Sequence, residues 1–261
     1  MFFLELIRKI EEIAPLPNAA PWDKSGIQVA AHRSEVNTLA VCLDPTPQSV
    51  ERALEAGADC LLSHHPLALK PDLPSRLDGY RETLRLLLSS DTPLYAAHTS
   101  LDTNPSGPAG WLAQELHLSD LSLLETVSRE DNDIHFGYGL VGNLPANLSM
   151  AELAKRLACH IDLSTANVSG PCPNSIQRVA YCTGAGASLS ERAHAVNADI
   201  FITGDVKYHA ALACNIAILD VGHHSLEEEM MRRMALWLEN LNLGVKIIFI
   251  PSNSPFKRFM A

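Results

Sequence analysis

The sequence contains no apolar run close to the roughly 18 residues that a membrane-spanning helix requires. Its first segment, MFFLELIRKIEEIA, also lacks the uninterrupted apolar stretch of a secretory signal peptide. The charged residues that interrupt it are Glu5, Arg8, Lys9, Glu11 and Glu12. The apolar residues of this segment recur at helical spacing, which predicts an amphipathic helix packed on a core. We therefore expect a cytoplasmic protein without a membrane partner.

The sequence is also poor in positive charge, with 20 Lys and Arg residues against 30 Asp and Glu residues and a net charge of −10. Such a chain repels nucleic-acid phosphates and anionic lipid surfaces, which argues against a nucleic-acid partner. The six cysteines form no C-x-x-C pair, which argues against a zinc knuckle or a thioredoxin-like motif, and we expect reduced thiols. Hydrophobic residues make up 47% of the 261 residues, enough for one large or two small folded domains.

Short apolar runs alternate with helical patterns along the chain, which predicts βαβ units and an α/β fold. Expected strands cover 36–43, 59–62, 93–97, 136–141, 177–182, 199–202, 216–221 and 245–250. Expected helices cover 46–56, 80–88, 110–116, 206–214 and 226–241, and two capping boxes, Ser149 with Glu152 and Ser188 with Glu191, predict two more. Stretches rich in polar residues or in Pro and Gly predict loops at 119–135 and 167–175.

This pattern predicts two similar α/β units with mixed, mostly parallel sheets covered by helices. We expect residues 1–126 to form the first unit, completed by 226–261, and residues 127–225 to form the second.

Histidine placement is the most informative feature of the sequence. Six of the 11 histidines lie in three short clusters, each just past the end of an expected strand. The clusters read LLSHHP at 61–66, AHTSLD at 97–102, and TGDVKYH at 203–209 followed by DVGHHSLE at 220–227. Because ligand sites of open α/β sheets form at the carboxyl ends of strands, these side chains are expected to converge there.

Imidazole and carboxylate groups without thiolate suit Zn, Fe, Mn, Co or Ni. More than four candidate ligands exceed one tetrahedral site and favour two metals, which Asp102 or Glu227 could bridge. His223 and Glu227 would share a helix face if that helix begins early enough. The neighbours His64 and His65 diverge in a regular strand, so both can serve only if the strand end bends. A lone histidine at a strand end is more often a hydrogen-bonded structural residue, but the joint occurrence of these clusters favours a metal site.

The sequence resembles the Nif-three-like, dinuclear-metal-centre hexameric proteins of the YbgI type, labelled GTP cyclohydrolase I type 2 homologs. The residues that carry the resemblance span most of the chain: PWDKSGIQ at 21–28, SHHPL at 63–67, HTSLD at 98–102, ITGDVKYH at 202–209 and GHHSLE at 222–227. The chain departs from many members in having LALK at 67–70 where they carry an aromatic residue, and it lacks the inserted domain of longer members.

The resemblance implies a set of metal ligands in which Glu227 is shared between two ions: His64, His65, Asp102, His223 and Glu227. Other matching residues would lie near the site or face the substrate: His98, Asp205, Lys207 and His209. It also implies a toroidal homohexamer, a trimer of dimers.

Two functions follow as hypotheses. The first is a metal-dependent hydrolase, GTP cyclohydrolase-like in its action on a nucleotide or related small molecule, with two divalent ions per chain. In it His98 or His209 would carry the proton and Lys207 would hold a phosphate. The alternative is a non-catalytic metal-binding, metallochaperone or scaffold toroid. Gly184 and Gly186 predict a tight turn rather than a phosphate cradle, and Trp22 is expected to be a packing aromatic.

Overall fold

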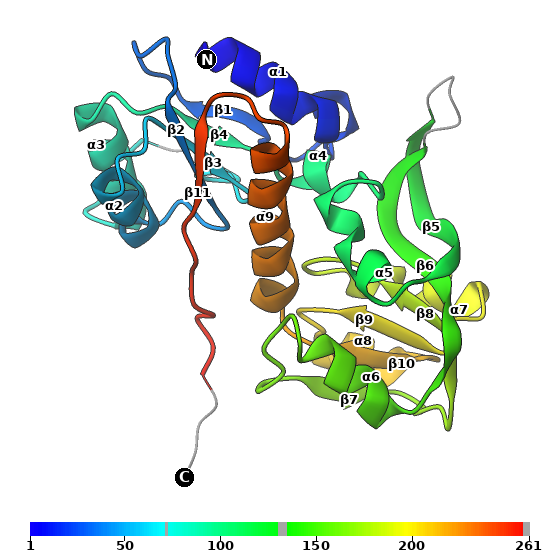
Figure 1. Cartoon of the computed structure of the whole chain (residues 1–261). Coiled ribbons are helices and arrows are strands. Elements are labelled where there is room, and N and C mark those ends of the chain that lie inside the picture. Colours follow the sequence, from blue (N-terminus) through cyan, green and yellow to red (C-terminus); the bar gives the residue numbers. More distant parts are fainter. Residues whose placement is uncertain (71–72, 130–134, 258–261) are drawn as a thin grey trace. The chain divides into compact units, whose positions relative to one another are not determined.

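The computed structural model describes residues 1–70, 73–129 and 135–257 and divides into two compact units (Figure 1). Unit 1 comprises Met1–Asp102 and Met230–Ser252, and unit 2 comprises Thr103–Glu229 and Asn253–Ala261. Each unit contains one mixed, helix-covered sheet, which confirms the predicted fold class. None of the helices in the described ranges combines the length and apolar character needed to cross a bilayer. The cytoplasmic location stays a prediction.

The sheet of unit 1 has the strand order β1-β4-β3-β2-β11, in which only β1 pairs antiparallel with its neighbour. Its strands are β1 (Gly26–Val29), β2 (Thr38–Cys42), β3 (Cys60–Ser63), β4 (Leu94–Ala96) and β11 (Lys246–Phe249). Its helices are α1 (Phe3–Ile13), η1 (Leu16–Asn18), α2 (Pro47–Glu55), α3 (Gly79–Ser89), α4 (Thr99–Asp102) and, from Met230 onward, α9 (His223–Asn240).

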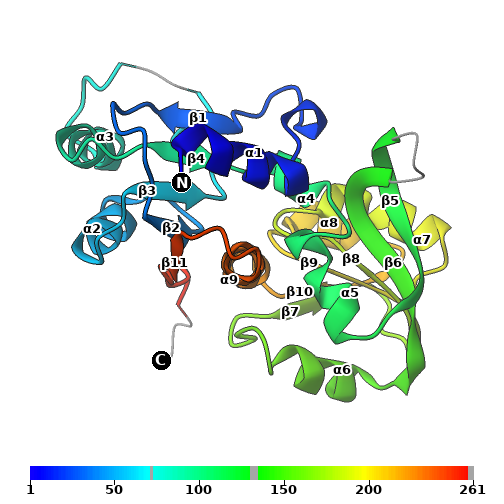
Figure 2. The same ribbon diagram turned by 45° about the horizontal axis from the view of Figure 1, so that its top comes forward.

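Helices cover both faces of this sheet: α2 and α3 lie on one face, α1 and α9 on the other (Figure 2). Every residue of β3 is buried, as expected for a central strand covered on both sides. A core cluster joins the sheet to α2 and α3 through residues such as Val50, Ala53 and Leu87. The predicted N-terminal helix is confirmed, because α1 buries Leu6 and Ile10 along its apolar stripe.

The sheet of unit 2 has the order β5-β6-β8-β9-β10-β7, with parallel pairing only among β8, β9 and β10. Its strands are β5 (Ser119–Arg129), β6 (His135–Leu148), β7 (Asn167–Ser169), β8 (Ile176–Tyr181), β9 (Ile200–Thr203) and β10 (Ala217–Asp220). Its helices are η2 (Pro108–Gly110), α5 (Trp111–Glu115), α6 (Met150–Leu157), η3 (Ala187–Leu189), α7 (Ser190–Ala195), α8 (Tyr208–Ala213) and the start of α9.

Three local predictions were wrong. Residues 119–129 form β5 rather than a loop, because antiparallel pairing with β6 overrides their polar composition. Residues 167–169 form the short edge strand β7 on β10. The box at Ser188 does not cap α7, since a 3-10 turn comes first and α7 begins at Ser190 without a side-chain cap. By contrast the box of Ser149 and Glu152 caps α6 as predicted. Part of the predicted polar loop, 130–134, lies outside the described residues.

The two units repeat one β-α-β element. Residues 38–65 and 178–205 align without a gap, with identical residues at Ala40/Ala180, Cys42/Cys182, Glu51/Glu191, Arg52/Arg192, Ala53/Ala193, Ala58/Ala198 and Asp59/Asp199. The hydrogen bonds repeat as well. The Asp59 carboxylate accepts from the backbone N–H groups of residues 37 and 38, and the Asp199 carboxylate from those of residues 177 and 178.

The repeat continues past the third parallel strand of each unit. HTSLD at 98–102 follows β4, and HHSLE at 223–227 follows β10. Each unit therefore places a histidine and, four residues later, an acid at the same point of its fold.

Candidate metal centre

Three imidazoles gather at the carboxyl ends of β3 and β4 in unit 1. One ring nitrogen from each of His64, His65 and His98 lies within 4.8 Å of those of the other two. Strand β3 ends at Ser63, where the Ser63 hydroxyl donates to the His65 carbonyl at 2.7 Å across a bend. The bend lets the neighbouring rings of His64 and His65 approach to 5.0 Å between centroids. The strand end therefore bends, as the sequence required for His64 and His65 to act together as metal ligands.

Hydrogen bonds orient the first two rings through Nδ1. His64 is fully buried, and its Nδ1 lies 2.9 Å from the Ala97 carbonyl oxygen, which can only accept. His65 Nδ1 lies 2.7 Å from Asp44 Oδ1. Each Nδ1 therefore carries the hydrogen, and Nε2 of the neutral ring keeps its lone pair for a metal or a proton. Oxygen acceptors behind the ligating histidine are the usual support of protein metal sites.

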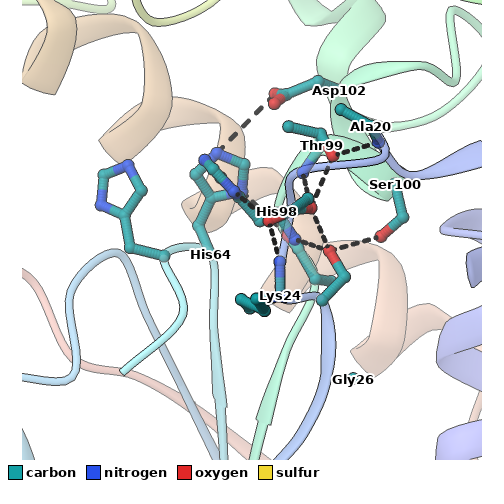
Figure 3. A network of polar contacts seen from close by, with 12 residues as sticks. Ala20, Lys24, Gly26, His64, His98, Thr99, Ser100 and Asp102 are labelled. Atoms are coloured by element: carbon teal, nitrogen blue, oxygen red, sulfur yellow. Dashed lines mark hydrogen bonds and ion pairs between the residues drawn. The ribbon is translucent and has the colours of Figure 1, made fainter. Parts of the chain in front are cut away.

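Asp102 extends this group from the end of α4. Its Oδ1 lies 3.7 Å from His64 Nε2, and Figure 3 shows its carboxylate directed at the His64 ring. The Nδ1 atom of His64 is bonded to a backbone carbonyl. His64 Nε2 and the Asp102 carboxylate oxygen are therefore neighbouring atoms that could each bind a metal ion. Within unit 1 the structure thus brings together His64, His65, Asp102 and His98.

His98 follows β4 and is held by Asp23, in the loop before β1. His98 Nδ1 lies 2.7 Å from Asp23 Oδ1, and the His98 backbone N–H donates to Ser25 Oγ at 3.1 Å. Trp22 is not the packing aromatic that the sequence suggested. It is 59% exposed, and its ring lies edge-on to the His98 ring with 5.8 Å between the ring centroids.

Unit 2 supplies a second donor pair at the start of α9. The helix begins at His223, three residues before the expected start, so His223 and Glu227 share a face as the spacing required. His223 Nε2 lies 2.7 Å from Glu227 Oε2, and Glu227 is only 3% exposed. His223 Nδ1 lies 2.8 Å from Asp205 Oδ2. Asp205 has a φ of 56°, a left-handed conformation that Asp tolerates at some cost and that is common at functional sites.

The turn at Gly184 lies directly against this pair. A Cβ at Gly184 would stand 2.1 Å from Glu227 Oε1, and its φ of +60° also favours glycine. Gly186 N–H donates to Thr203 Oγ1, and Gly204 N–H to the Gly184 carbonyl. These bonds hold the turn in place, so its glycine makes room for the carboxylate of Glu227.

Lys207 and His209 are exposed at the start of α8. In the part of the chain that the structure describes, no hydrogen bond or ion pair joins either residue to His223 or Glu227. Their catalytic roles stay predictions.

The sequence reasoning missed two residues that orient imidazoles, Asp44 and Asp23. Asp44 lies two residues past β2, so the rule that selected the histidines at strand ends could have found it. Asp23 precedes its strand, and only the tertiary contact with His98 marks it.

The side chains fit the divalent ions that the resemblance implies. The donors are imidazoles and carboxylates without thiolate, which matches Zn, Fe, Mn, Co or Ni and does not separate them. Unit 1 offers oriented rings and unit 2 offers a buried carboxylate beside His223, and both are donor types that such ions bind.

Alanine at Gly184 is expected to weaken metal binding, because its Cβ would displace the Glu227 carboxylate. Gly57→Ala is the matched control, since Gly57 also has positive φ (+81°) but nothing within 4 Å of an added Cβ. Both variants should lose about 1 kcal/mol of stability from backbone strain. Only Gly184→Ala should bind less metal, measured by elemental analysis after dialysis. Equal metal content in the two variants would contradict the assigned role of Gly184.

His223 predicts a pH dependence of stability in chelator-treated protein. Burial lowers its pKa, but the hydrogen bond and charge of Glu227, followed by those of Asp205, raise it to about 9 from 6.5. Because the folded pKa lies above the unfolded one, the charged imidazole stabilises the fold fully below pH 6.5, and this contribution is lost as pH rises through about 9. Urea unfolding should show a decline over that window that His223→Gln reduces. Identical pH profiles for the two proteins would refute the assignment.

Comparison with known proteins places these residues in a family. A family model described as Duf34/NIF3 (NGG1p interacting factor 3) matches residues 1–255. A Streptomyces coelicolor protein named GTP cyclohydrolase 1 type 2 homolog is 30% identical over 230 residues, covering 85% of this chain and 80% of its own. A Lactococcus lactis protein of the same name is 28% identical over 93% of both chains.

Solved structures agree with that placement. The Bacillus cereus protein related to NIF3 superposes with a TM-score of 0.89 over 99% of both chains at 21% identity, which shows the shared fold. The protein ybgI superposes with a TM-score of 0.83 at 27% identity over 98% of this chain and 100% of its own. Reduced HcgD from Methanocaldococcus jannaschii superposes with a TM-score of 0.80 at 27% identity over 96% of this chain and 98% of its own. The chain belongs to the Duf34/NIF3 family.

Proposed function

We propose that the chain is a metal-dependent hydrolase that acts on a nucleotide or a related small molecule. Two divalent ions would be held by His64, His65, Asp102, His223 and Glu227. The observation that carries the proposal is the gathering of oriented imidazoles in unit 1, each with an oxygen acceptor on Nδ1. The name GTP cyclohydrolase 1 type 2 homolog, carried by relatives, supports the nucleotide class of substrate.

Bound divalent ions would supply Lewis acidity and lower the pKa of a water toward neutrality. The side chains of this protein would do the rest. His98 lies beside His64 and His65 and would accept a proton. The exposed ammonium of Lys207 would bind a phosphate, and His209 next to it would exchange protons with solvent. A non-catalytic metal carrier or scaffold would use the same ligands without these last steps.

Elemental analysis of untagged protein tests the ligand set. We expect about two ions per wild-type chain and loss of metal in His65→Ala and Glu227→Gln, with folding checked by circular dichroism. His194→Ala, an exposed histidine outside the site, is the matched control and should keep its metal. A wild-type protein that takes up no Zn, Fe, Mn, Co or Ni on reconstitution would refute the proposal.

Turnover then separates the two functions. The loaded wild-type protein should hydrolyse at least one member of a nucleotide panel that includes GTP, and Glu227→Gln should not. Metal that exchanges with an acceptor, without turnover on any member, would favour the carrier.

We also propose the homohexamer that the resemblance implies. Light scattering should give a mass six times that of the 28.4 kDa chain. A monomeric or dimeric mass at micromolar concentration would contradict it.

A further inference from the structure

The carboxylate of Asp23 is saturated with hydrogen-bond donors. Oδ1 accepts from the Lys24 backbone N–H at 2.6 Å and from His98 Nδ1 at 2.7 Å. Oδ2 accepts from Ser25 Oγ at 2.7 Å, and from the Thr99 backbone N–H and hydroxyl. The side chain is fully buried. Figure 3 shows the polar network around the labelled residues Lys24, His98 and Thr99.

These donors keep the carboxylate ionised. Burial alone would raise the pKa of Asp23, but the hydrogen bonds from His98, Thr99 and Ser25 outweigh it and hold the pKa far below its usual range. An ionised carboxylate only accepts, so His98 Nδ1 must be the donor of their shared bond. The Nε2 atom of a neutral His98 ring is therefore left with its lone pair.

We propose that Asp23 is the positioning residue of the candidate centre: it holds His98 in the Nδ1–H tautomer so that Nε2 accepts a proton from a water beside His64 and His65. The role rests on the proposed hydrolase function. In the step, the water O–H bond breaks and an Nε2–H bond forms. The resulting imidazolium has hydrogen on both nitrogens, and the ionised Asp23 balances its charge. The hydroxide bonds to the electrophilic atom of the substrate while the bond from that atom to the leaving group breaks, and Nε2 returns the proton to the leaving group.

The position of the His98 ring supports this role. His98 is anchored at its backbone N–H by Ser25 and at its ring by Asp23, and Trp22 meets the ring edge-on. The ring centroid lies 5.1 Å from that of His64 and 5.4 Å from that of His65. A histidine held at its backbone and at its ring needs little reorganisation when it takes up a proton.

The internal repeat contains a second histidine that an aspartate holds at Nδ1. His98 occupies the position in HTSLD that His223 occupies in HHSLE. Asp205 holds His223 Nδ1 at 2.8 Å, as Asp23 holds His98 Nδ1 at 2.7 Å. The two aspartates lie at unrelated places in their units, so each unit has supplied the same support to its histidine from a different segment.

Asparagine cannot replace Asp23 without loss. Each carboxylate oxygen accepts from a backbone N–H, Oδ1 from Lys24 and Oδ2 from Thr99. The amide NH2 of Asn would face one of these N–H groups in either orientation. The uncharged side chain would also be a poorer acceptor for His98 Nδ1 and would let the Nε2–H tautomer form.

Nitrogen NMR of metal-free protein labelled with 15N-histidine, at a pH where His98 is neutral, tests the tautomer directly. We expect wild-type His98 to carry its hydrogen on Nδ1, with a rise in Nε2–H in Asp23→Asn. Asp59→Asn is the matched control, because Asp59 also accepts backbone N–H bonds but contacts no histidine of the group. Its His98 signals should match the wild type. A wild-type His98 with hydrogen on Nε2 would overturn the proposal even if no variant folded.

Metal content and turnover complete the test. Asp23→Asn should keep the metal content of the wild type, with kcat for nucleotide hydrolysis about 10²- to 10⁴-fold lower and KM little changed. His98→Gln should show the same loss, and Asp23→Glu should restore part of it. Unchanged kcat in Asp23→Asn would overturn the role of Asp23. A wild-type protein without turnover would instead refute the hydrolase function and leave the tautomer result standing.

Discussion

The candidate centre depends on one constraint: the Nδ1 hydrogen of each imidazole is given to an oxygen fixed within the same unit. The acceptor is a backbone carbonyl for His64 and a carboxylate for His65, His98 and His223. Because Nδ1 is engaged in this way, Nε2 is the nitrogen left to donate electrons in the neutral rings of His64, His65 and His98, while His223 Nε2 lies against the Glu227 carboxylate. Histidines at strand ends could otherwise be ordinary hydrogen-bonded residues, and these acceptors give them the orientation that metal chemistry requires.

The repeat explains how two similar units came to hold different ligands. In unit 1, Asp44 follows strand β2 and accepts the hydrogen bond from Nδ1 of His65, which follows strand β3. The aligned positions of unit 2 are Gly184 and Asp205. In unit 2, Asp205 follows strand β9 and accepts the hydrogen bond from His223 Nδ1. Gly184 leaves the space that the carboxylate of Glu227 occupies. One β-α-β framework therefore supports two different donor sets, since the residues past its strand ends differ between the units.

The fold could be predicted where local pattern and tertiary packing agree. Buried parallel strands such as β3 and β9 appear in the sequence as short apolar runs, and the capping box of Ser149 and Glu152 predicts the start of α6. The prediction was wrong for β5 and β7. Most of their described side chains are partly or fully exposed at the edges of the sheet, so polar residues interrupt the apolar runs that mark buried strands. These segments are strands because β5 pairs with β6 and β7 pairs with β10, and a short stretch of sequence does not reveal such pairing.

The sequence by itself determined the α/β class and the family resemblance, and through that resemblance it predicted a set of donor residues, because strand ends and short motifs are local features. The tertiary structure alone decided which nitrogen of each histidine is available, since Asp23 lies 75 positions from His98 in the chain. It also decided that His64 and His65 can face one region, through the bend after Ser63, and that Gly184 must be glycine. The tautomer of His98 and the requirement for glycine at 184 depend on contacts between distant segments, and such contacts exist only once the sheets have formed.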